Sequence, residues 1–327
     1  MNTLTSPQPL VRVQGLKKHF VSSGSFFSKK VQTLKAVDGV SFDIKASETL
    51  GLVGESGCGK STTGRCILGL IESTDGEVFY QTTNVSRLDH RQFRSYRRNL
   101  QIIFQDPFSS LNPRLSVESA LREVLAVHKL AEGESAARRV NELMEMVGLP
   151  SSHRHKFPHE FSGGQRQRIG IARALAVEPK FIVCDEPVSA LDVSIQAQII
   201  NLLTGLQKQL SLTYLFIAHD LAVVRHISNR VAVMYLGKIV ELADTDDLYH
   251  KPLHPYTQAL LSAVPAQDPG SKKPRTILRG EIPSPSDPPP GCAFHTRCPM
   301  AKQECREIQP ELKEAGKEHF VSCHLVH

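Results

Sequence analysis

Short apolar runs and longer periodic stretches alternate along the chain. The runs at 49–53, 181–186 and 212–218 are continuously apolar or nearly so and predict buried strands of a parallel sheet. The stretches 116–128 and 134–147 place apolar residues three or four positions apart, and 61–70 has a similar helical character. This alternation of strands and helices predicts an α/β fold.

Other segments predict an edge and a loop. Residues 11–14 and 40–44 predict an antiparallel β edge, and 75–80 predicts a turn that leads into a strand. Segment 104–114 carries two prolines and little periodicity, so it predicts a loop surface available for docking. After a short helix at 254–261, repeated prolines between 265 and 290 predict a stiff tail without regular secondary structure.

Length and composition limit the class of protein. With 327 residues, 40% of them hydrophobic, the chain can bury one α/β core and a smaller appendage. No apolar run is long enough to span a membrane, and the first twenty residues lack the apolar part of a signal peptide, so we expect a soluble protein. The net charge of +6 is mild. We interpret the basic clusters at 91–98 and 166–173 as solvated helix faces, phosphate-proximal residues or a membrane-side surface rather than a nucleic-acid site.

The segment 54–62, GESGCGKST, matches the phosphate-binding pattern G-x-x-x-x-G-K-[ST]. It follows a predicted strand and precedes a predicted helix, which disfavours an ordinary glycine-rich turn. The glycines allow backbone N–H groups to surround the phosphates, and the helix N-terminus adds partial positive charge. Lys60 is expected to neutralise the β and γ phosphates, and Ser61 to bind Mg²⁺.

Two acids end the strand predicted at 181–186. Asp185 is expected to hold Mg²⁺ through water, and Glu186 to polarise the water that attacks the γ-phosphate. His219 follows the strand at 212–218 and is expected to orient that water. Solvated acids and a structural histidine are the simpler alternatives. The distinctive sequence at 187–192 and the position of His219 favour catalytic functions for these residues.

With FSGGQ at 161–165, the chain resembles the ATP-binding cassette (ABC) ATPases over roughly residues 10–265. The resemblance implies a Walker A loop at 54–61, a Q-loop glutamine at Gln105, Walker B at 181–186, a D-loop at 189–192 and a switch histidine at His219. It implies catalytic roles for Glu186, His219 and Gln105. The ATP and Mg²⁺ ligands that it implies are Phe20, Gly54, Glu55, Ser56, Gly57, Cys58, Gly59, Lys60, Ser61, Thr62, Gln105 and Asp185.

Two positions differ from the usual family pattern. Phe20 stands where tyrosine often stacks on adenine, and an insert at 21–30 follows it. Phe161 replaces a common leucine, outside the residues that contact phosphate, and we expect no loss of activity from it.

In this family the signature acts on the nucleotide of the opposite subunit. The residues implied to act across the dimer are Ser162, Gly163, Gly164, Gln165 and Asp192, with a helix expected at 163–176. Two ATP molecules then hold a head-to-tail dimer together. The helical subdomain, about residues 105–175, is implied to contact short cytoplasmic helices of membrane subunits.

Four of the seven cysteines, Cys292, Cys298, Cys305 and Cys323, lie near the C-terminus in the pattern C-x5-C-x6-C-x17-C. In a reducing cytosol such a group favours a metal or iron–sulfur site over disulfides. The spacing is not the C-x2-C of a typical zinc ribbon, and loosely packed thiols are the alternative. The other three cysteines, Cys58, Cys66 and Cys184, are predicted to be small buried residues.

HPY at 254–256 and GCAFHTRCP at 291–299 resemble the C-terminal extension of oligopeptide and dipeptide importer ATPases, a subgroup that includes nickel importers. The resemblance implies domains at 1–265 and 266–327 and a [4Fe–4S] cluster on the four cysteines, with Zn²⁺ as the alternative. It implies a second ABC ATPase, with a heterodimer favoured over a homodimer, two transmembrane permease subunits and, indirectly, an extracytoplasmic peptide-binding protein. The expected location is the cytoplasmic face of the inner membrane, peripherally bound.

The expected function is ATP hydrolysis that powers import of dipeptides or oligopeptides, with nickel or an opine as alternative cargo. A soluble ABC ATPase of DNA repair or translation is disfavoured, because the chain has no long coiled-coil insertion and no second cassette. A P-loop small-molecule kinase would have no use for residues 162–165. No nucleic-acid partner is expected.

Overall fold

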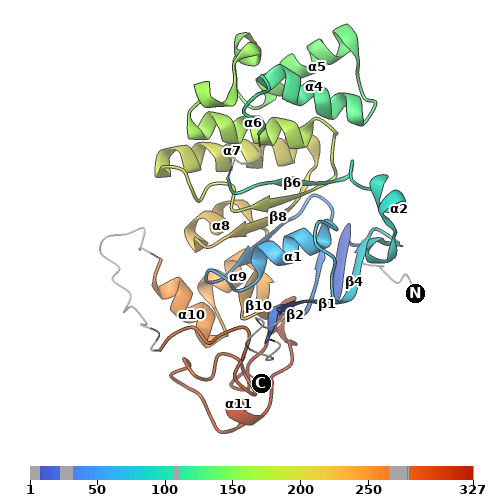
Figure 1. Cartoon of the computed structure of the whole chain (residues 1–327). Helices are drawn as coiled ribbons and strands as arrows, with labels where there is room; N and C mark the ends of the chain where they lie inside the picture. The colour runs from blue at the N-terminus through green and yellow to red at the C-terminus, as the bar shows by residue number, and fades with distance from the viewer. Residues whose placement is uncertain (1–7, 23–31, 107–110, 265–277, 279, 327) are drawn as a thin grey trace, which may run out of the picture. The chain divides into compact units, whose positions relative to one another are not determined.

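The computed structural model describes residues 8–22, 32–106, 111–264, 278 and 280–326. The chain divides into two compact units (Figure 1). Unit 1 comprises residues 1–44, 49–87 and 218–327, and unit 2 comprises 45–48 and 88–217. Most of the insert predicted at 21–30 and the middle of the predicted loop at 104–114 lie outside the described residues.

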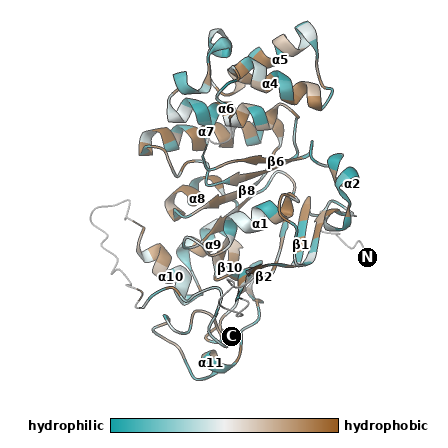
Figure 2. Cartoon of the chain, in the orientation of Figure 1, coloured by the Kyte–Doolittle hydropathy of each residue, from teal (hydrophilic) through white to brown (hydrophobic). Residues whose placement is uncertain are grey.

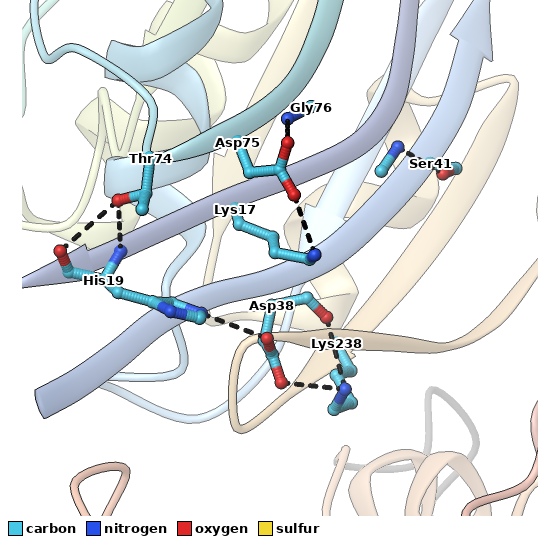
Figure 3. Close-up of polar contacts among 9 residues, drawn as sticks. Lys17, His19, Asp38, Ser41, Thr74, Asp75, Gly76 and Lys238 are labelled. Carbon is cyan, nitrogen blue, oxygen red and sulfur yellow. Dashed lines mark hydrogen bonds and ion pairs between the residues drawn. The ribbon is translucent and has the colours of Figure 1, made fainter.

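Unit 1 contains an antiparallel sheet in the order β2-β1-β4-β5. Its strands are β1 (Val11–Ser22), β2 (Gln32–Ile44), β4 (Asp75–Tyr80) and β5 (Thr83–Asn84), and the 3₁₀ turn η1 (Val85–Arg87) follows. The antiparallel β structure predicted at 11–14 and 40–44 is confirmed, but both strands are longer than predicted. Polar residues continue β1 because they pair across the sheet: Lys17 contacts Asp75 at 2.9 Å, and His19 contacts Asp38 at 3.0 Å (Figure 3).

A second sheet of unit 1 has the order β11-β12-β10-β9-β3. Strand β3 (Thr49–Val53) is parallel to β9 (Arg230–Tyr235), which forms an antiparallel hairpin with β10 (Lys238–Asp244). The helices of this unit are α1 (Lys60–Ile67), α8 (Leu221–Ile227), α9 (Thr245–His250), α10 (Pro255–Ser262) and α11 (Glu304–Glu307). Helix α1 ends earlier than the predicted residue 70, because Gly69 adopts a left-handed φ of 61° just after Leu68.

The C-terminal extension adds strands to this second sheet. Its described proline-rich residues, 278 and 280–290, contain no helix or strand, as predicted. Farther on, β12 (His319–Val321) pairs antiparallel with β10, and β11 (Lys313–Gly316) pairs with β12. The domain boundary at residue 265 stays a prediction, since the described residues on both sides of it belong to unit 1.

A buried carboxylate joins the extension to the rest of unit 1. Glu241 of β10 is fully buried and accepts hydrogen bonds from the backbone N–H groups of Leu253 (2.7 Å) and His254 (3.0 Å). It also contacts the imidazole Nε2 of His319 in β12 at 2.8 Å. The polar atoms of this cluster are therefore satisfied in the interior, as burial requires.

His254 makes the stability of the protein sensitive to acid. Burial lowers the pKa of His254 from 6.5 to about 4, against the raising effect of nearby Glu241. Between these pH values the unfolded chain takes up a proton that the folded protein does not, so the free energy of unfolding falls as the pH drops. The loss is up to about 3 kcal/mol on going from about pH 6.5 to pH 4.

We therefore expect that His254→Asn, which keeps a side-chain acceptor for the N–H of Tyr256, will flatten the decline of stability in acid. Denaturant unfolding at a series of pH values measures this slope. The exposed His90, replaced by asparagine, provides the matched control and should leave the slope unchanged. An equally steep decline in His254→Asn and in the unmodified protein would contradict the assignment.

Unit 2 is built on parallel strands in the order β6-β7-β8: β6 (Leu100–Ile103), β7 (Phe181–Asp185) and β8 (Thr213–Ala218). Its helices are α2 (His90–Arg94), α4 (Val117–Val127), α5 (Gly133–Met146), α6 (Gly163–Leu175) and α7 (Val193–Leu210), with 3₁₀ turns η2 (Ser151–His155) and η3 (Pro158–Glu160). Figure 2 shows hydrophobic strands β6 and β8, whereas α4 and α5 carry both hydrophilic and hydrophobic residues. The helices predicted at 116–128, 134–147 and 163–176 are confirmed.

Two arginines of the basic clusters at 91–98 and 166–173 also have structural partners. The guanidinium of Arg98 donates to the carbonyl of Val177 at 3.0 Å. Arg168 donates to the carbonyl of Val147 at 2.6 Å, where helix α5 has ended. These charges hold carbonyl groups at chain turns. The arginines of the first cluster, Arg91, Arg94, Arg97 and Arg98, are exposed, which agrees with a solvated face, whereas Arg166, Arg168 and Arg173 are half-buried.

Candidate nucleotide-binding site

The phosphate loop connects β3 to α1 within unit 1. A side chain at Gly54 would place Cβ 2.1 Å from the carbonyl oxygen of Met234, and one at Gly59, where φ is 105°, would place it 2.0 Å from that of Ala36. Only glycine fits at these positions, because backbone from β2 and β9 closes on the loop.

Lys60 holds its charge inside this loop. The residue is only 4% exposed, and its Nζ donates to the carbonyls of Gly54 (2.8 Å) and Glu55 (3.0 Å). Ser56 and Gly57, by contrast, are exposed at the rim. An ammonium beneath an exposed rim of backbone amides, at the start of a helix, suits a phosphate group.

Glu55 is anchored from two places in unit 1. Its backbone N–H donates to the hydroxyl of Tyr256 in α10 at 3.0 Å. Its carboxylate accepts two hydrogen bonds from Arg297 of the C-terminal extension. The sequence did not reveal these partners, although an acidic residue inside a phosphate loop is itself a signal that a counter-ion is needed.

An aromatic cluster backs this part of the loop. The rings of Tyr235 and Tyr256 lie 4.8 Å apart, and Phe294 of the extension lies 5.3 Å from Tyr235 and 5.4 Å from Tyr256. Tyr235, Tyr256 and Phe294 are each at most 1% exposed. Such tilted and edge-to-face contacts between buried rings stabilise the packing of the extension against β9 and α10.

Phe20 lies on β1 with its side chain exposed. It is 39% exposed, and the ammonium of Lys18 lies 4.9 Å from the ring centroid. The neighbouring part of β1 is fixed by Asp38, which lies 3.0 Å from the imidazole of His19 and 2.9 Å from the ammonium of Lys238 (Figure 3). Burial by itself raises the pKa of Asp38, but Lys238, with help from His19 and Lys35, lowers it overall and favours the charged carboxylate. The exposed ring remains a prediction for the adenine contact.

In unit 2 the structure brings two of the predicted catalytic residues together. The amide Nε2 of Gln105 donates to Oε2 of Glu186 at 3.1 Å. Asp185 is the last residue of β7 and is 1% exposed. The predicted strand 181–186 ends one residue early, since Glu186 has a φ of 47° and leaves the strand direction while its N–H donates to the carbonyl of Ile217.

The signature segment begins helix α6. The hydroxyl of Ser162 accepts the N–H of Gln165, and the Gln165 side chain accepts the N–H of Ser162, which together form a capping box. Ser162 and Gly163 are exposed, whereas Gly164 is buried, and a Cβ there would lie 2.5 Å from Ile195. The capping box therefore fixes the start of α6, and Ser162 and Gly163 are exposed there.

The remaining predicted residues lie at element ends. Asp192 is exposed and precedes α7, and the next residue, Val193, is 81% exposed. His219 is exposed and directly follows β8. The phosphate loop, Phe20 and His219 belong to unit 1, whereas Gln105, the two acids, the signature and Asp192 belong to unit 2.

The four C-terminal thiols interact with one another. Cys305 and Cys323 are buried, and Cys292 and Cys298 are half-buried. The pKa of Cys292 is raised to about 11, above all by burial and also by the other three cysteines. The sulfurs of Cys292, Cys298 and Cys323 each accept a backbone N–H from two residues farther along the chain, which lowers their pKa in part.

The predicted metal cluster is not supported by this arrangement. Within the described parts of the chain, no three or more Cys, His, Asp and Glu side chains form a group that could hold a metal ion. The prediction that Cys58, Cys66 and Cys184 are buried is confirmed.

The described residues also contain no helix that is both long and apolar enough to cross a membrane.

Known solved structures share the fold of this chain. It is similar to the ATP-binding cassette MJ0796 in a dimeric post-hydrolysis state bound to ADP and Pi, with a TM-score of 0.64 and 29% identity over 72% of this chain and 98% of that one. A second dimeric structure of MJ0796 gives a TM-score of 0.62 and 27% identity, with the same coverage of 72% and 98%. The predicted α/β ABC ATPase fold, with its antiparallel β part and helices, is confirmed.

The family follows from sequence comparisons over nearly the whole chain. The ABC transporter model matches residues 37–189, and the model of the oligopeptide/dipeptide transporter C-terminal region matches residues 240–305. The chain is 54% identical to the oligopeptide transport ATP-binding protein AppF of Bacillus subtilis, over 99% of both chains. It is 52% identical to OppF of Escherichia coli K12, also an oligopeptide transport ATP-binding protein, over 99% of this chain and 98% of that one. The chain therefore belongs to the ATP-binding subunits of ABC transporters, in the oligopeptide/dipeptide transporter family.

Proposed function

We propose that this chain binds and hydrolyses ATP to power the import of oligopeptides or dipeptides through a membrane ABC transporter. It is an ABC ATPase subunit of the oligopeptide transport family. The observation that carries the substrate class is the C-terminal match at 240–305, because that region lies beyond residues 37–189, which match the general ABC transporter model.

In the proposed reaction the phosphate loop binds the triphosphate. Backbone N–H groups at 54–61 surround the phosphates, and Lys60 neutralises charge on the β and γ phosphates. Hydroxyl and carboxylate oxygens suit Mg²⁺, which would be held by Ser61 and, through water, by the buried Asp185. When bound, Mg²⁺ neutralises charge that develops on the phosphates.

Three residues are proposed to act on the attacking water. Glu186 polarises it, Gln105 holds the Glu186 carboxylate through the hydrogen bond of 3.1 Å, and His219 orients it towards the γ-phosphate. The exposed positions of Gln105 and His219 support these roles, since both side chains are accessible.

A second ATPase subunit is the proposed partner at the signature. The residues that would act across this dimer are Ser162, Gly163, Gly164, Gln165 and Asp192. The exposed N-terminus of α6 supports binding of a partner's γ-phosphate, and Asp192 is likewise exposed. A heterodimer with a similar ATPase is the preferred form, and a homodimer is the alternative.

The permease subunits are proposed to dock on unit 2. A pocket of about 500 Å³ is lined there by Phe104 and Leu111, from either end of the predicted docking loop, and by Val124 and Val127 of α4. Val127 is 60% exposed. The lining combines these apolar residues with polar and charged ones, among them Glu123, His128 and Arg173. Such a mixed groove, next to Gln105 in the sequence, suits a short amphipathic helix of a membrane subunit, and it would couple docking to the catalytic water. The chain would then lie peripherally at the cytoplasmic face of the inner membrane, while an extracytoplasmic binding protein delivers the peptide.

Stimulation of ATP hydrolysis by the right partner tests this function. The chain is purified with its cognate permease subunits and second ATPase, and hydrolysis is measured in proteoliposomes with peptides, nickel or an opine. We expect peptide-dependent stimulation. Stimulation by DNA or ribosomes, or transfer of phosphate to a small-molecule acceptor, would overturn the proposal, and stimulation by nickel or an opine alone would replace the substrate class.

The finer proposal for the C-terminal cysteines is one [4Fe–4S] cluster with a structural function, with Zn²⁺ as the alternative. The grouping of all four cysteines within residues 292–323 and the backbone N–H groups that face three of the sulfurs support it. Binding would require the sulfurs to draw closer together than the present arrangement, and no step of ATP hydrolysis passes through the cluster.

Anaerobic purification tests the cluster. We expect a brown protein with broad absorbance near roughly 400 nm and about four irons per chain, as for Cys₄ ligation. Replacing Cys305 by serine should remove the colour and weaken assembly more than ATP binding, whereas Cys66→Ser, in the nucleotide-binding part, should keep the colour. Stoichiometric zinc without iron would establish the alternative, and a metal-free protein would leave four free thiols.

A further inference from the structure

A buried arginine of the C-terminal extension pairs with the acidic residue of the phosphate loop. Nη1 of Arg297 lies 2.6 Å from Oε2 of Glu55, and Nη2 lies 3.1 Å from Oε1, so the pair is bidentate. The side chain of Arg297 is 7% exposed and that of Glu55 is 25% exposed. Bidentate pairs shielded from water are specific in geometry and stronger than surface pairs.

The extension fixes the position of this arginine. The backbone N–H of Arg297 donates to the carbonyl of Phe294 at 3.0 Å, and the guanidinium lies 6.0 Å from the centroid of the Tyr235 ring. Phe294 is 1% exposed among Tyr235 and Tyr256. Arg297 reaches Glu55 only while this aromatic cluster holds the extension in place.

The Arg297–Glu55 pair offsets a negative charge within the phosphate loop. A triphosphate carries several negative charges, and Glu55 places another within the same loop, next to Gly54. At separations of several ångströms and partial burial, one unpaired carboxylate would weaken binding of a triphosphate by about 10-fold. The guanidinium cancels this charge and holds the carboxylate through both of its oxygens.

We propose that Arg297 is the counter-ion and positioning residue of the phosphate loop, so that affinity for ATP depends on the docked C-terminal extension. Arg297 contacts Glu55 and not the nucleotide. The inference rests on the proposed function only in that residues 54–61 bind the triphosphate. It gives the extension a function in nucleotide binding, whatever its cysteines hold.

The test measures ATP hydrolysis by the assembled transporter and binding of a fluorescent ATP analogue. In Arg297→Gln we expect the KM and Kd for ATP to rise about 10-fold, with kcat changed less than about 2-fold. The effect should be larger at low ionic strength and smaller for ADP, which has less charge. The exposed Arg306 of α11 gives the matched control, and Arg306→Gln should leave the KM unchanged.

The double variant separates charge from packing. Glu55→Gln combined with Arg297→Gln lacks the ion pair but also lacks the unpaired carboxylate, so its KM should return to within about 3-fold of the unmodified value. A KM that stays raised in the double variant, or one that does not rise in Arg297→Gln, would overturn the inference.

A further variant distinguishes this inference from the proposed site. Lys60→Ala should abolish nucleotide binding if the loop at 54–61 holds the phosphates. Normal binding by Lys60→Ala would remove the proposed site, whereas loss of binding there together with an unchanged KM in Arg297→Gln would remove only the counter-ion.

Discussion

Replacing Glu186 by glutamine is expected to slow ATP hydrolysis by a factor of about 10² to 10³ while leaving ATP binding intact. The amide cannot polarise the attacking water as a carboxylate does, yet it has nearly the same shape. It can therefore still contact Gln105, whose Nε2 lies 3.1 Å from Oε2 of Glu186 in the unmodified protein. Because ATP would bind without being cleaved, the ATP-bound dimer should accumulate. Hydrolysis by the full transporter and size-exclusion chromatography with ATP measure the two effects.

The exposed Glu145 of α5 provides the control for this experiment. Glu145→Gln removes the same charge from the same unit and should leave the turnover unchanged. Near-normal turnover in Glu186→Gln would exclude this residue from the mechanism. A lost affinity for ATP would instead indicate that Glu186 supports the nucleotide itself.

Replacing Glu241 by leucine is expected to lower the free energy of unfolding by about 3 to 5 kcal/mol. The carboxylate is fully buried and accepts hydrogen bonds from two backbone N–H groups, and it also faces the imidazole of His319. Leucine leaves these groups buried without an acceptor, and each then costs much of its hydration energy. Denaturant unfolding at pH 7 measures the change.

Glu241→Gln should cost less, because its amide oxygen still accepts one of the hydrogen bonds. Glu281→Leu is the matched control at an exposed position, and it should change stability by less than about 0.5 kcal/mol. If Glu241→Leu unfolded with the same midpoint and slope as the unmodified protein, the buried cluster would contribute nothing to the stability of unit 1.

Local signals in the sequence predicted the helical part of unit 2 well. Ser116 caps α4 through its hydroxyl, and His128 stands at its other end, which are the bounds that the apolar periodicity indicated. The signature serine likewise begins α6. Caps and periodicity act between residues three or four positions apart, so one sequence contains all the information that they need.

Long-range polar pairs could not be predicted in the same way. Strand β1 continues beyond its apolar start because Lys17 and His19 find carboxylates on other strands. Arg297 and Glu55 lie 242 positions apart, and no local pattern links them. The same holds for Glu241 and His319, which the fold alone brings together. The motifs indicated the candidate site, but its supporting partners depend on the tertiary structure.

The pairing of β12 with β10 affects what a shortened version of this chain could do. Cassettes of the length of MJ0796 correspond to 72% of this chain. If the extension were removed, β10 would lose its pairing with β12 at Glu241 and Leu242 and become the edge of its sheet, where unpaired N–H and C=O groups can accept another strand. A truncated form would therefore expose a new strand edge in unit 1 even with every nucleotide-binding motif retained.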